Sequence, residues 1–107
     1  MGKKVLVLGT GAQGTTVAKR LELEPNVDKI ILADYDEAAV KELASELSKA
    51  EGYFCDASDI EQIKKLLDGC FMVVNALPLA FGKNVIDAAL EAKCHYQDFA
   101  APEGFED

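Results

Sequence analysis

The sequence predicts an α/β fold: a doubly wound parallel sheet of about five strands, with helices on both faces. Apolar runs alternate with segments of helical periodicity along the 107 residues. Three of the runs are almost continuously apolar, which is typical of strands buried on both sides of a parallel sheet. A glycine-rich turn joins the first run to the first helical segment. Right-handed crossovers then give the strand order 3-2-1-4-5.

The first half of the chain contains two expected strands and two expected helices. The strand Lys4–Leu8 leads into a helix over Gly11–Leu23, which ends before Pro25. After the second strand, Lys29–Ala33, a helix over Asp36–Lys49 begins with Asp36 as its N-cap. Apolar residues recur at helical spacing in both helices: Val17, Ala18 and Leu21 in the first, and Val40, Leu43, Ala44 and Leu47 in the second.

The second half continues the alternation with shorter strands. The capping box Ser58–Glu61 predicts the start of the third helix, and Gly69 predicts its end. The remaining expected elements are the strands Tyr53–Asp56, Phe71–Val74 and His95–Phe99 and the helix Leu79–Ala92. The apolar faces are expected to be Ile60, Ile63, Leu66 and Leu67 in the third helix, and Val85, Ile86, Ala89 and Leu90 in the fourth.

The length indicates one domain over residues 1–107, and the sequence contains no visible linker or internal repeat. A net charge of −8 argues against nucleic acid and anionic membranes as partners. No apolar stretch reaches the ~18 residues of a membrane span. The start of the chain lacks a signal-peptide pattern, so a cytoplasmic location is expected. Three cysteines (Cys55, Cys70 and Cys94) at long spacings indicate buried free thiols rather than disulfides or a metal site.

The glycine-rich turn has the spacing of a dinucleotide-binding loop. Gly9, Gly11 and Gly14 form the pattern G-x-G-x-x-G between a strand and a helix. Gly9 allows the sharp turn, Gly11 allows a pyrophosphate to approach the backbone, and Gly14 allows close packing of helix and sheet. The amides of Gly11, Ala12, Gln13 and Gly14 are expected to face the phosphates at the positive end of the helix.

An acid follows at the expected distance. Asp34 ends the second strand, 20 residues after Gly14, and is predicted to bind the ribose hydroxyls of the adenosine. A carboxylate there repels a 2′-phosphate, and no arginine follows it, so NAD is favoured over NADP. The competing interpretation is that Asp34 caps the next helix, a role that Asp36 also fits. Tyr35 is either a contact for adenine or an exposed turn residue.

Two further turns follow strands at the same sheet edge. Asp56 and Ala57 come after the third strand, where Asp56 either binds the adenine amine or starts the next helix. Asn75, Ala76 and Pro78 follow the fourth strand across the topological switch point, where ligands bind in such folds. Asn75 or the adjacent backbone is a candidate for holding the nicotinamide ribose, and a plain strand-to-helix turn is the alternative.

The last strand carries the only grouped titratable residues expected near the nicotinamide. These are His95, Tyr96 and Asp98. Asp98 is the better candidate for proton transfer, because it stands at the carboxyl end of its strand. A lone histidine is more often a solvated residue.

Together these motifs resemble the amino-terminal domain of saccharopine dehydrogenase-like proteins. The resemblance spans nearly the whole chain and includes the glycine loop, Cys55–Asp59, Val73–Pro78, and the ending Tyr96-Gln97-Asp98. It implies cofactor roles for Gly9, Gly11, Gly14, Asp34, Asp56, Asn75 and Pro78, and a place near the reaction centre for Asp98. Family members transfer hydride, with NAD or NADP, at a carbon bonded to an amino group.

The resemblance also implies a longer enzyme. Family members are several times longer, with a second domain that binds the substrate and mediates assembly. The chain is therefore expected to be the NAD-binding part of an amino-acid dehydrogenase, inactive alone, with an amino-acid substrate and a homodimer as expected partners. The alternative is a non-enzymatic NAD sensor of the potassium-transport regulator type, which shares the glycine loop and both acids.

Overall fold

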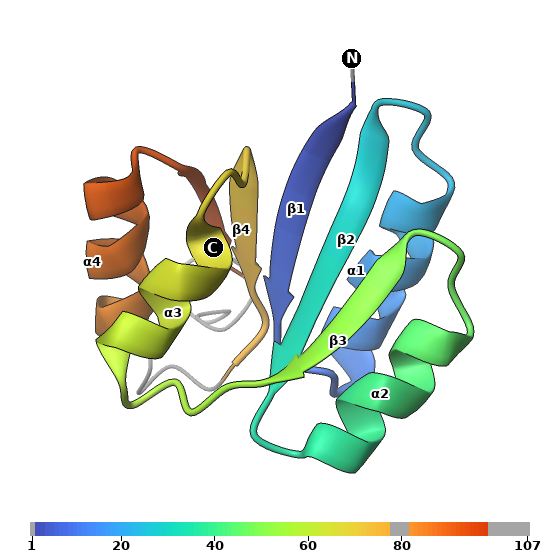
Figure 1. The fold of residues 1–107 in the computed structure, drawn as a ribbon, viewed down its shortest axis with the longest axis horizontal. Coiled ribbons are helices and arrows are strands. Elements are labelled where there is room, and N and C mark those ends of the chain that lie inside the picture. The colour runs from blue at the N-terminus through green and yellow to red at the C-terminus, as the bar shows by residue number, and fades with distance from the viewer. Residues whose placement is uncertain (1, 78–81, 99–107) are drawn as a thin grey trace, which may run out of the picture.

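A computed structural model of the protein describes residues 2–77 and 82–98, and it shows a parallel sheet between two layers of helices (Figure 1). The strands are β1 (Lys3–Leu8), β2 (Val27–Asp34), β3 (Ala50–Phe54), β4 (Met72–Asn75) and β5 (His95–Asp98). The helices are α1 (Ala12–Glu22), α2 (Glu37–Ser45), α3 (Ile60–Leu67) and α4 (Gly82–Ala92). All paired strands are parallel and their order is β3-β2-β1-β4-β5, which confirms the predicted fold class.

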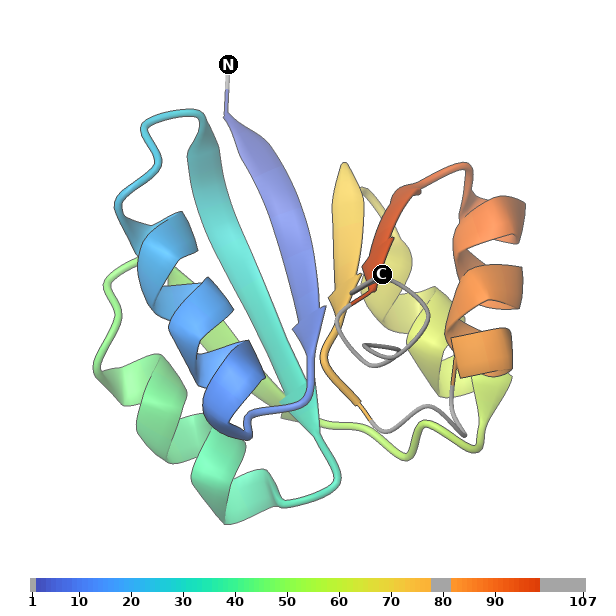
Figure 2. The same ribbon diagram turned by 180° about the vertical axis from the view of Figure 1, so that it is seen from behind.

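The helices cover the sheet in two pairs. Helices α1 and α2 pack on one face of β1, β2 and β3, and α3 and α4 lie on the other face beside β4 and β5 (Figures 1 and 2). Each layer encloses its own apolar cluster. Val7, Ile30 and Leu32 face α1 and α2, whereas Leu6, Leu8 and Val73 face α3 and α4. The central strands are therefore buried on both sides, as their continuous apolar runs predicted.

The boundary between α2 and β3 differs from the sequence prediction. Helix α2 begins after Asp36, whose side chain accepts a hydrogen bond from the Ala39 amide, as expected. It ends at Ser45 rather than Lys49, and β3 begins at Ala50 rather than Tyr53. The Glu22 carboxylate of α1 accepts hydrogen bonds from the Ser48 amide and hydroxyl and from the Lys49 amide. This contact from another helix holds the turn outside α2.

Two details of the later helices also differ. Asp59 rather than Ser58 caps α3, because its side chain accepts a hydrogen bond from the Glu61 amide, while the Ser58 hydroxyl donates to Asp56. On α4 the buried residues are Val85, Ala88 and Ala89. Ile86 and Leu90, which were predicted on the inner face, are 39% and 72% exposed. Small alanines let α4 approach the sheet and α3 closely, so the larger side chains lie outside.

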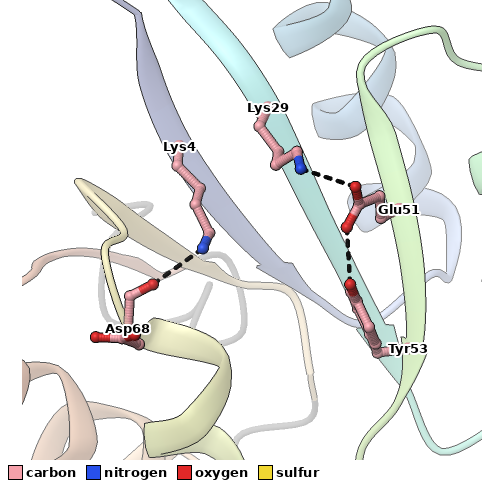
Figure 3. Close-up of polar contacts among 5 residues, drawn as sticks. All are labelled: Lys4, Lys29, Glu51, Tyr53 and Asp68. Carbon is pink, nitrogen blue, oxygen red and sulfur yellow. Dashed lines mark hydrogen bonds and ion pairs between the residues drawn. The ribbon is translucent and has the colours of Figure 1, made fainter.

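Polar side chains occupy part of the sheet face that bears α3 and α4. Lys29 of β2 forms an ion pair at 2.8 Å with Glu51 of β3, and Tyr53 donates to the same carboxylate at 2.7 Å (Figure 3). Nearby, the Lys4 amine donates to the backbone carbonyl of Asp68 at 3.0 Å. These groups are solvent-exposed, so they add solubility to this part of the sheet more than stability. Among the described residues, no helix has the length and apolarity needed to cross a membrane.

Candidate functional site

The pairing of the strands brings the predicted site residues to one edge of the sheet. Leu8 at the end of β1 pairs with Ala33 on one side and with Asn75 on the other. Asp34 pairs with Phe54, and Asn75 pairs with Asp98. The five strands therefore all end at this edge, and the described residues that follow β1, β2, β3 and β4 lie close to one another. In doubly wound sheets this is the edge that binds ligands.

Gly9 and Gly14 are glycines because the fold leaves no room for a side chain. Gly9 has φ of +98°, a conformation that favours glycine, and a Cβ there would lie 2.9 Å from the Ala76 carbonyl oxygen. A Cβ on Gly14 would lie 1.9 Å from the Gly9 carbonyl oxygen. Glycine at these two positions therefore allows the glycine loop, α1 and the loop after β4 to pack closely together.

Gly11 is different, because its missing side chain serves no contact within the protein. Apart from the residues next to it in the chain, no atom of the described residues lies within 4 Å of a Cβ placed on Gly11. Gly11 is the N-cap of α1, its backbone is extended, and no side chain caps the helix there. Ala12 and Gln13 follow it in the first turn and are exposed. The positive end of α1 thus faces an open space that a phosphate could enter.

Asp34 is held by hydrogen bonds from two segments. Its Oδ2 accepts from the Thr10 amide at 2.7 Å and the Thr10 hydroxyl at 2.6 Å, and its Oδ1 accepts from the Asp36 amide at 3.0 Å. Partial burial by itself would raise the pKa of Asp34, but these bonds outweigh it and lower the pKa below its usual value. Asp36, not Asp34, is the N-cap of α2. A carboxylate that is ionised and fixed in place therefore lies beside the glycine loop.

A pocket of about 310 Å³ lies beside Asp34. Its lining is mainly apolar and comes from the loops after β2, β3 and β4, with Tyr35, Cys55, Ala57 and Leu77 among its residues. Tyr35 is 69% exposed, and its ring centroid lies 5.3 Å from that of Phe54. A flat aromatic group could bind in such a pocket between small apolar side chains.

Asp56 also lines this pocket, with its carboxylate partly engaged. Its Oδ1 accepts from the Ser58 hydroxyl and amide, and these bonds lower the pKa of Asp56. Asp59 is the N-cap of α3, so Asp56 does not cap this helix. Within the fold, the Asp56 side chain shapes the turn before α3. Ala57 is buried, and its carbonyl oxygen accepts a hydrogen bond from Asn84 of α4.

Asn75 is fully buried and shapes the loop after β4. Its Oδ1 accepts from the Leu77 amide at 3.0 Å, and its Nδ2 donates to the Tyr96 hydroxyl at 3.1 Å. The side chain of Asn75 is thus used inside the protein. Within the described residues, a contact between this loop and a ligand would therefore come from the backbone near Asn75, from half-buried Ala76 and from Leu77, which lines the pocket.

The remaining candidates are divided between the two edges of the sheet. Asp98 ends β5 and pairs with Asn75 at the site edge; its side chain lies outside the described part of the structure, as does Pro78. His95 begins β5, so it lies at the opposite edge, where its ring centroid is 4.6 Å from that of Phe71. The expectation that His95 lies near the nicotinamide was wrong, because β5 runs parallel to β4.

The cysteines behave as structural thiols. Cys55 is buried, Cys70 and Cys94 are half-buried, and all three are free. Burial raises the pKa of Cys55 and of Cys70 to about 11 and raises that of Cys94 as well. Within residues 2–77 and 82–98, no group of three or more His, Cys, Asp or Glu side chains could hold a metal ion.

The structure adds site residues that the sequence reasoning missed. Thr10 contacts Asp34, and Phe54 packs against Tyr35. Leu77 and Tyr96 belong to motifs that the sequence analysis already named, and the structure adds their contacts: Leu77 lines the pocket, and Tyr96 supports Asn75. A signal for Thr10 was present: Leu8 and Ala33 were expected on neighbouring strands, so the residues just beyond them meet. The packing of Phe54 against Tyr35 left no pattern in the sequence.

The fold and the site together define a Rossmann-type dinucleotide-binding domain. A glycine loop opens the helix after β1, and an acid ends β2 at the same edge of a doubly wound sheet. Residues 5–104 match the family model that is described as the saccharopine dehydrogenase NADP binding domain. The chain therefore belongs to this family of dehydrogenase domains.

Solved structures of dehydrogenases resemble the chain. Apo saccharopine dehydrogenase (L-Glu forming) from Saccharomyces cerevisiae is 26% identical, with a TM-score of 0.82 over 91% of this chain and 21% of that chain. A short chain dehydrogenase from Mycobacterium smegmatis is 23% identical, with a TM-score of 0.71 over 85% of this chain and 52% of that one. A variant of uronate dehydrogenase from Agrobacterium tumefaciens, complexed with NAD, is 22% identical, with a TM-score of 0.63 over 87% and 38%.

These comparisons support the fold and the dinucleotide-binding class. The two matches below 25% identity show the fold alone. The chain spans 21% of the length of the yeast saccharopine dehydrogenase that it matches.

Proposed function

We propose that this chain is the NAD-binding domain of an amino-acid dehydrogenase that transfers hydride at a carbon bonded to an amino group. The observation that carries the proposal is that Asp34, held by Thr10 of the glycine loop, and the uncapped N-terminus of α1 lie at the same edge of the sheet. Membership of the saccharopine dehydrogenase NADP-binding domain family supports the dehydrogenase class. Bound NAD would supply the hydride acceptor, and the chain's own residues would bind and orient it.

The diphosphate is the part of the ligand for which the loop is best suited. The amides of Gly11, Ala12, Gln13 and Gly14 belong to the first turn of α1, where the helix dipole favours an anion. Gly11 leaves the approach open, since in residues 2–77 and 82–98 nothing but its own chain neighbours lies within 4 Å of its Cβ position. Gly9 and Gly14 hold the loop in the shape that makes this approach possible.

The adenosine would lie across Asp34 and the adjacent pocket. Asp34 can accept hydrogen bonds from ribose hydroxyls, and the pocket of about 310 Å³ is open to a flat base. Tyr35 and Phe54 form an exposed aromatic pair at this place, suited to stacking. Asp56 is the acceptor available for the exocyclic amine of adenine.

The charges near Asp34 support NAD over NADP. Asp34 ends β2, Asp36 is the N-cap of α2, and Glu37 begins that helix. Residues 30–40 contain neither lysine nor arginine. A 2′-phosphate would be repelled by these carboxylates. The family description names NADP, and Lys19 lines a cleft of about 240 Å³ together with Thr10. Selectivity therefore has to be measured directly.

The nicotinamide would lie near the loop after β4. Asn75 fixes this loop, and Asp98 ends the neighbouring strand at the same edge. We propose Asp98 as the carboxylate of this domain that serves proton transfer during hydride transfer. Substrate contacts would come from other parts of the intact enzyme, as the longer yeast saccharopine dehydrogenase suggests.

Titration calorimetry with NADH and NADPH tests the proposed function. We expect the purified chain to bind NADH more tightly than NADPH. In Asp34→Ala, the affinity for NADH falls by about tenfold or more, because a hydrogen bond to a charged group contributes about 1.5–3 kcal/mol. The midpoint of thermal unfolding serves as the control for folding.

Three results would count against the proposal. No binding of either dinucleotide would overturn the binding function, and tighter binding of NADPH would overturn the cofactor assignment. A collapse of the melting temperature in Asp34→Ala would show that the acid is structural. Activity with amino-acid substrates is measured on the intact enzyme, with Asp98→Asn compared to the wild type.

A further inference from the structure

Thr10, the second residue of the glycine loop, makes two hydrogen bonds to the carboxylate of Asp34. Its amide donates to Oδ2 at 2.7 Å, and its hydroxyl donates to the same oxygen at 2.6 Å. We propose that Thr10 is a positioning residue for dinucleotide selectivity. Its hydroxyl holds the Asp34 carboxylate, ionised and in one orientation, for a ribose with a free 2′-hydroxyl. This inference rests on the proposed function of the site.

Three hydrogen bonds, two from Thr10 and one from Asp36, form a clamp on the Asp34 carboxylate. Thr10 and Asp34 are 24 residues apart in the chain. Thr10 holds Oδ2 from the glycine loop, and the Asp36 amide holds Oδ1 at 3.0 Å from the turn after β2. Because both oxygens accept hydrogen bonds, the carboxylate has little freedom to rotate. Hydrogen bonds to an ionised acceptor are about twice as strong as neutral ones, so the clamp is stronger than its number of bonds suggests.

The hydroxyl is the part of the clamp that depends on the identity of residue 10. Any residue except proline would supply the amide bond, but only a hydroxyl-bearing side chain of this size supplies the second donor. The Thr10 backbone is itself held, because the Thr15 hydroxyl of α1 donates to the Thr10 carbonyl oxygen at 3.0 Å. The short side chain of Thr10 therefore projects from a loop backbone that is itself held by α1.

A fixed, ionised carboxylate discriminates better than a mobile one. It accepts a ribose 2′-hydroxyl without losing rotational freedom on binding, and it repels a 2′-phosphate from a constant position. Partial burial opposes the charge on Asp34, whereas the bonds from Asp36 and Thr10 favour it and lower the pKa of Asp34. Removing the hydroxyl should therefore weaken NADH binding more than NADPH binding.

The test compares three variants of the 107-residue chain with the wild type. Thr10→Val removes the hydroxyl and keeps the shape, and Thr10→Ser restores the hydroxyl. Thr16→Val is the matched control, because the Thr16 hydroxyl bonds to the Ala12 carbonyl oxygen and does not contact Asp34. For each protein, the affinities for NADH and NADPH are measured by calorimetry. The pKa of Asp34 in the ligand-free protein is measured by NMR of its carboxyl carbon.

We expect Thr10→Val to lose about tenfold in NADH affinity, with a smaller change for NADPH, so that selectivity falls. The pKa of Asp34 should rise in Thr10→Val, return toward the wild-type value in Thr10→Ser, and stay unchanged in Thr16→Val. An unchanged pKa of Asp34 in Thr10→Val would overturn the inference, as would unchanged or tighter NADH binding. Because the NMR measurement needs no ligand, it decides on the clamp even if the wild type binds no dinucleotide.

Discussion

At the scale of single residues, Gly11 and Gly14 of the glycine loop are glycines for different reasons. Gly14 is required by the fold, since a Cβ would come within 1.9 Å of the Gly9 carbonyl oxygen, which is backbone and cannot move aside cheaply. Gly11 has empty space at the same place. The motif predicts a different role for each of these glycines. The structure shows the close packing at Gly14 and leaves space beside Gly11 for a ligand.

The pair Gly14→Ala and Gly11→Ala tests this distinction. Gly14→Ala should lose about 1–3 kcal/mol of unfolding free energy or more, because the added methyl overpacks the loop. Gly11→Ala should keep its stability within about 1 kcal/mol, because its Cβ meets no atom, but should bind NADH more weakly. Urea denaturation and calorimetry measure the two effects. Equal loss of stability in both variants would contradict the distinction.

At the scale of elements, β4 and β5 are joined by a side-chain hydrogen bond as well as by the backbone pairing of the two strands. Fully buried Asn75 at the end of β4 accepts from the Leu77 amide and donates to the hydroxyl of Tyr96 in β5. The side chain therefore fixes the direction in which the chain leaves β4. A buried polar side chain of this kind contributes through the groups that it satisfies.

We expect Asn75→Ala to lose about 1–3 kcal/mol of unfolding free energy, because the Leu77 amide loses its acceptor and a cavity is left. Tyr96→Phe, which removes only the hydroxyl, should lose about 1 kcal/mol. Urea denaturation of the two variants measures the difference. If Asn75→Ala were as stable as the wild type, the loop would be held by other contacts.

At the scale of the whole molecule, an exposed carboxylate links separate elements. Glu22 at the end of α1 accepts from the Ser48 hydroxyl and amide and from the Lys49 amide before β3. The bond from the Ser48 hydroxyl is the main cause that lowers the pKa of Glu22 below its usual value. The pKa of Asp34 and of Asp56 is lowered as well.

These shifts predict acid sensitivity. A carboxylate with a lowered folded-state pKa stabilises the protein fully above its unfolded-state pKa, and this contribution is lost as the pH falls through the folded-state pKa. Urea denaturation should thus give a decreasing unfolding free energy from about pH 5 downward. Glu22→Gln should show a shallower decrease than the wild type. An identical pH dependence in the variant would exclude Glu22 as a contributor.

The strand order, the helix order and the position of the site could be predicted from the sequence. The pattern of apolar runs and the distance from Gly14 to Asp34 are local properties of the chain, and the handedness of crossovers converts them into one topology. The wrong predictions are those that depend on contacts with other elements. Hydrogen bonds to Glu22 of α1 hold Ser48 and Lys49 outside α2. Ile86 and Leu90 are exposed, because α4 packs through other residues. The prediction for His95 was wrong for another reason: β5 is parallel to β4, so its first residue lies at the edge of the sheet away from the site.

The sequence by itself determined the fold class, the family and the edge at which a dinucleotide would bind, because periodicity and motif spacing are written along the chain. Only the tertiary structure decided what each site residue contacts. Thr10 and Asp34 are 24 residues apart, and Asn75 and Tyr96 are 21 apart, so their hydrogen bonds exist only once the parallel strands are in register. Contacts between distant segments depend on the path of the whole chain, which no local pattern specifies.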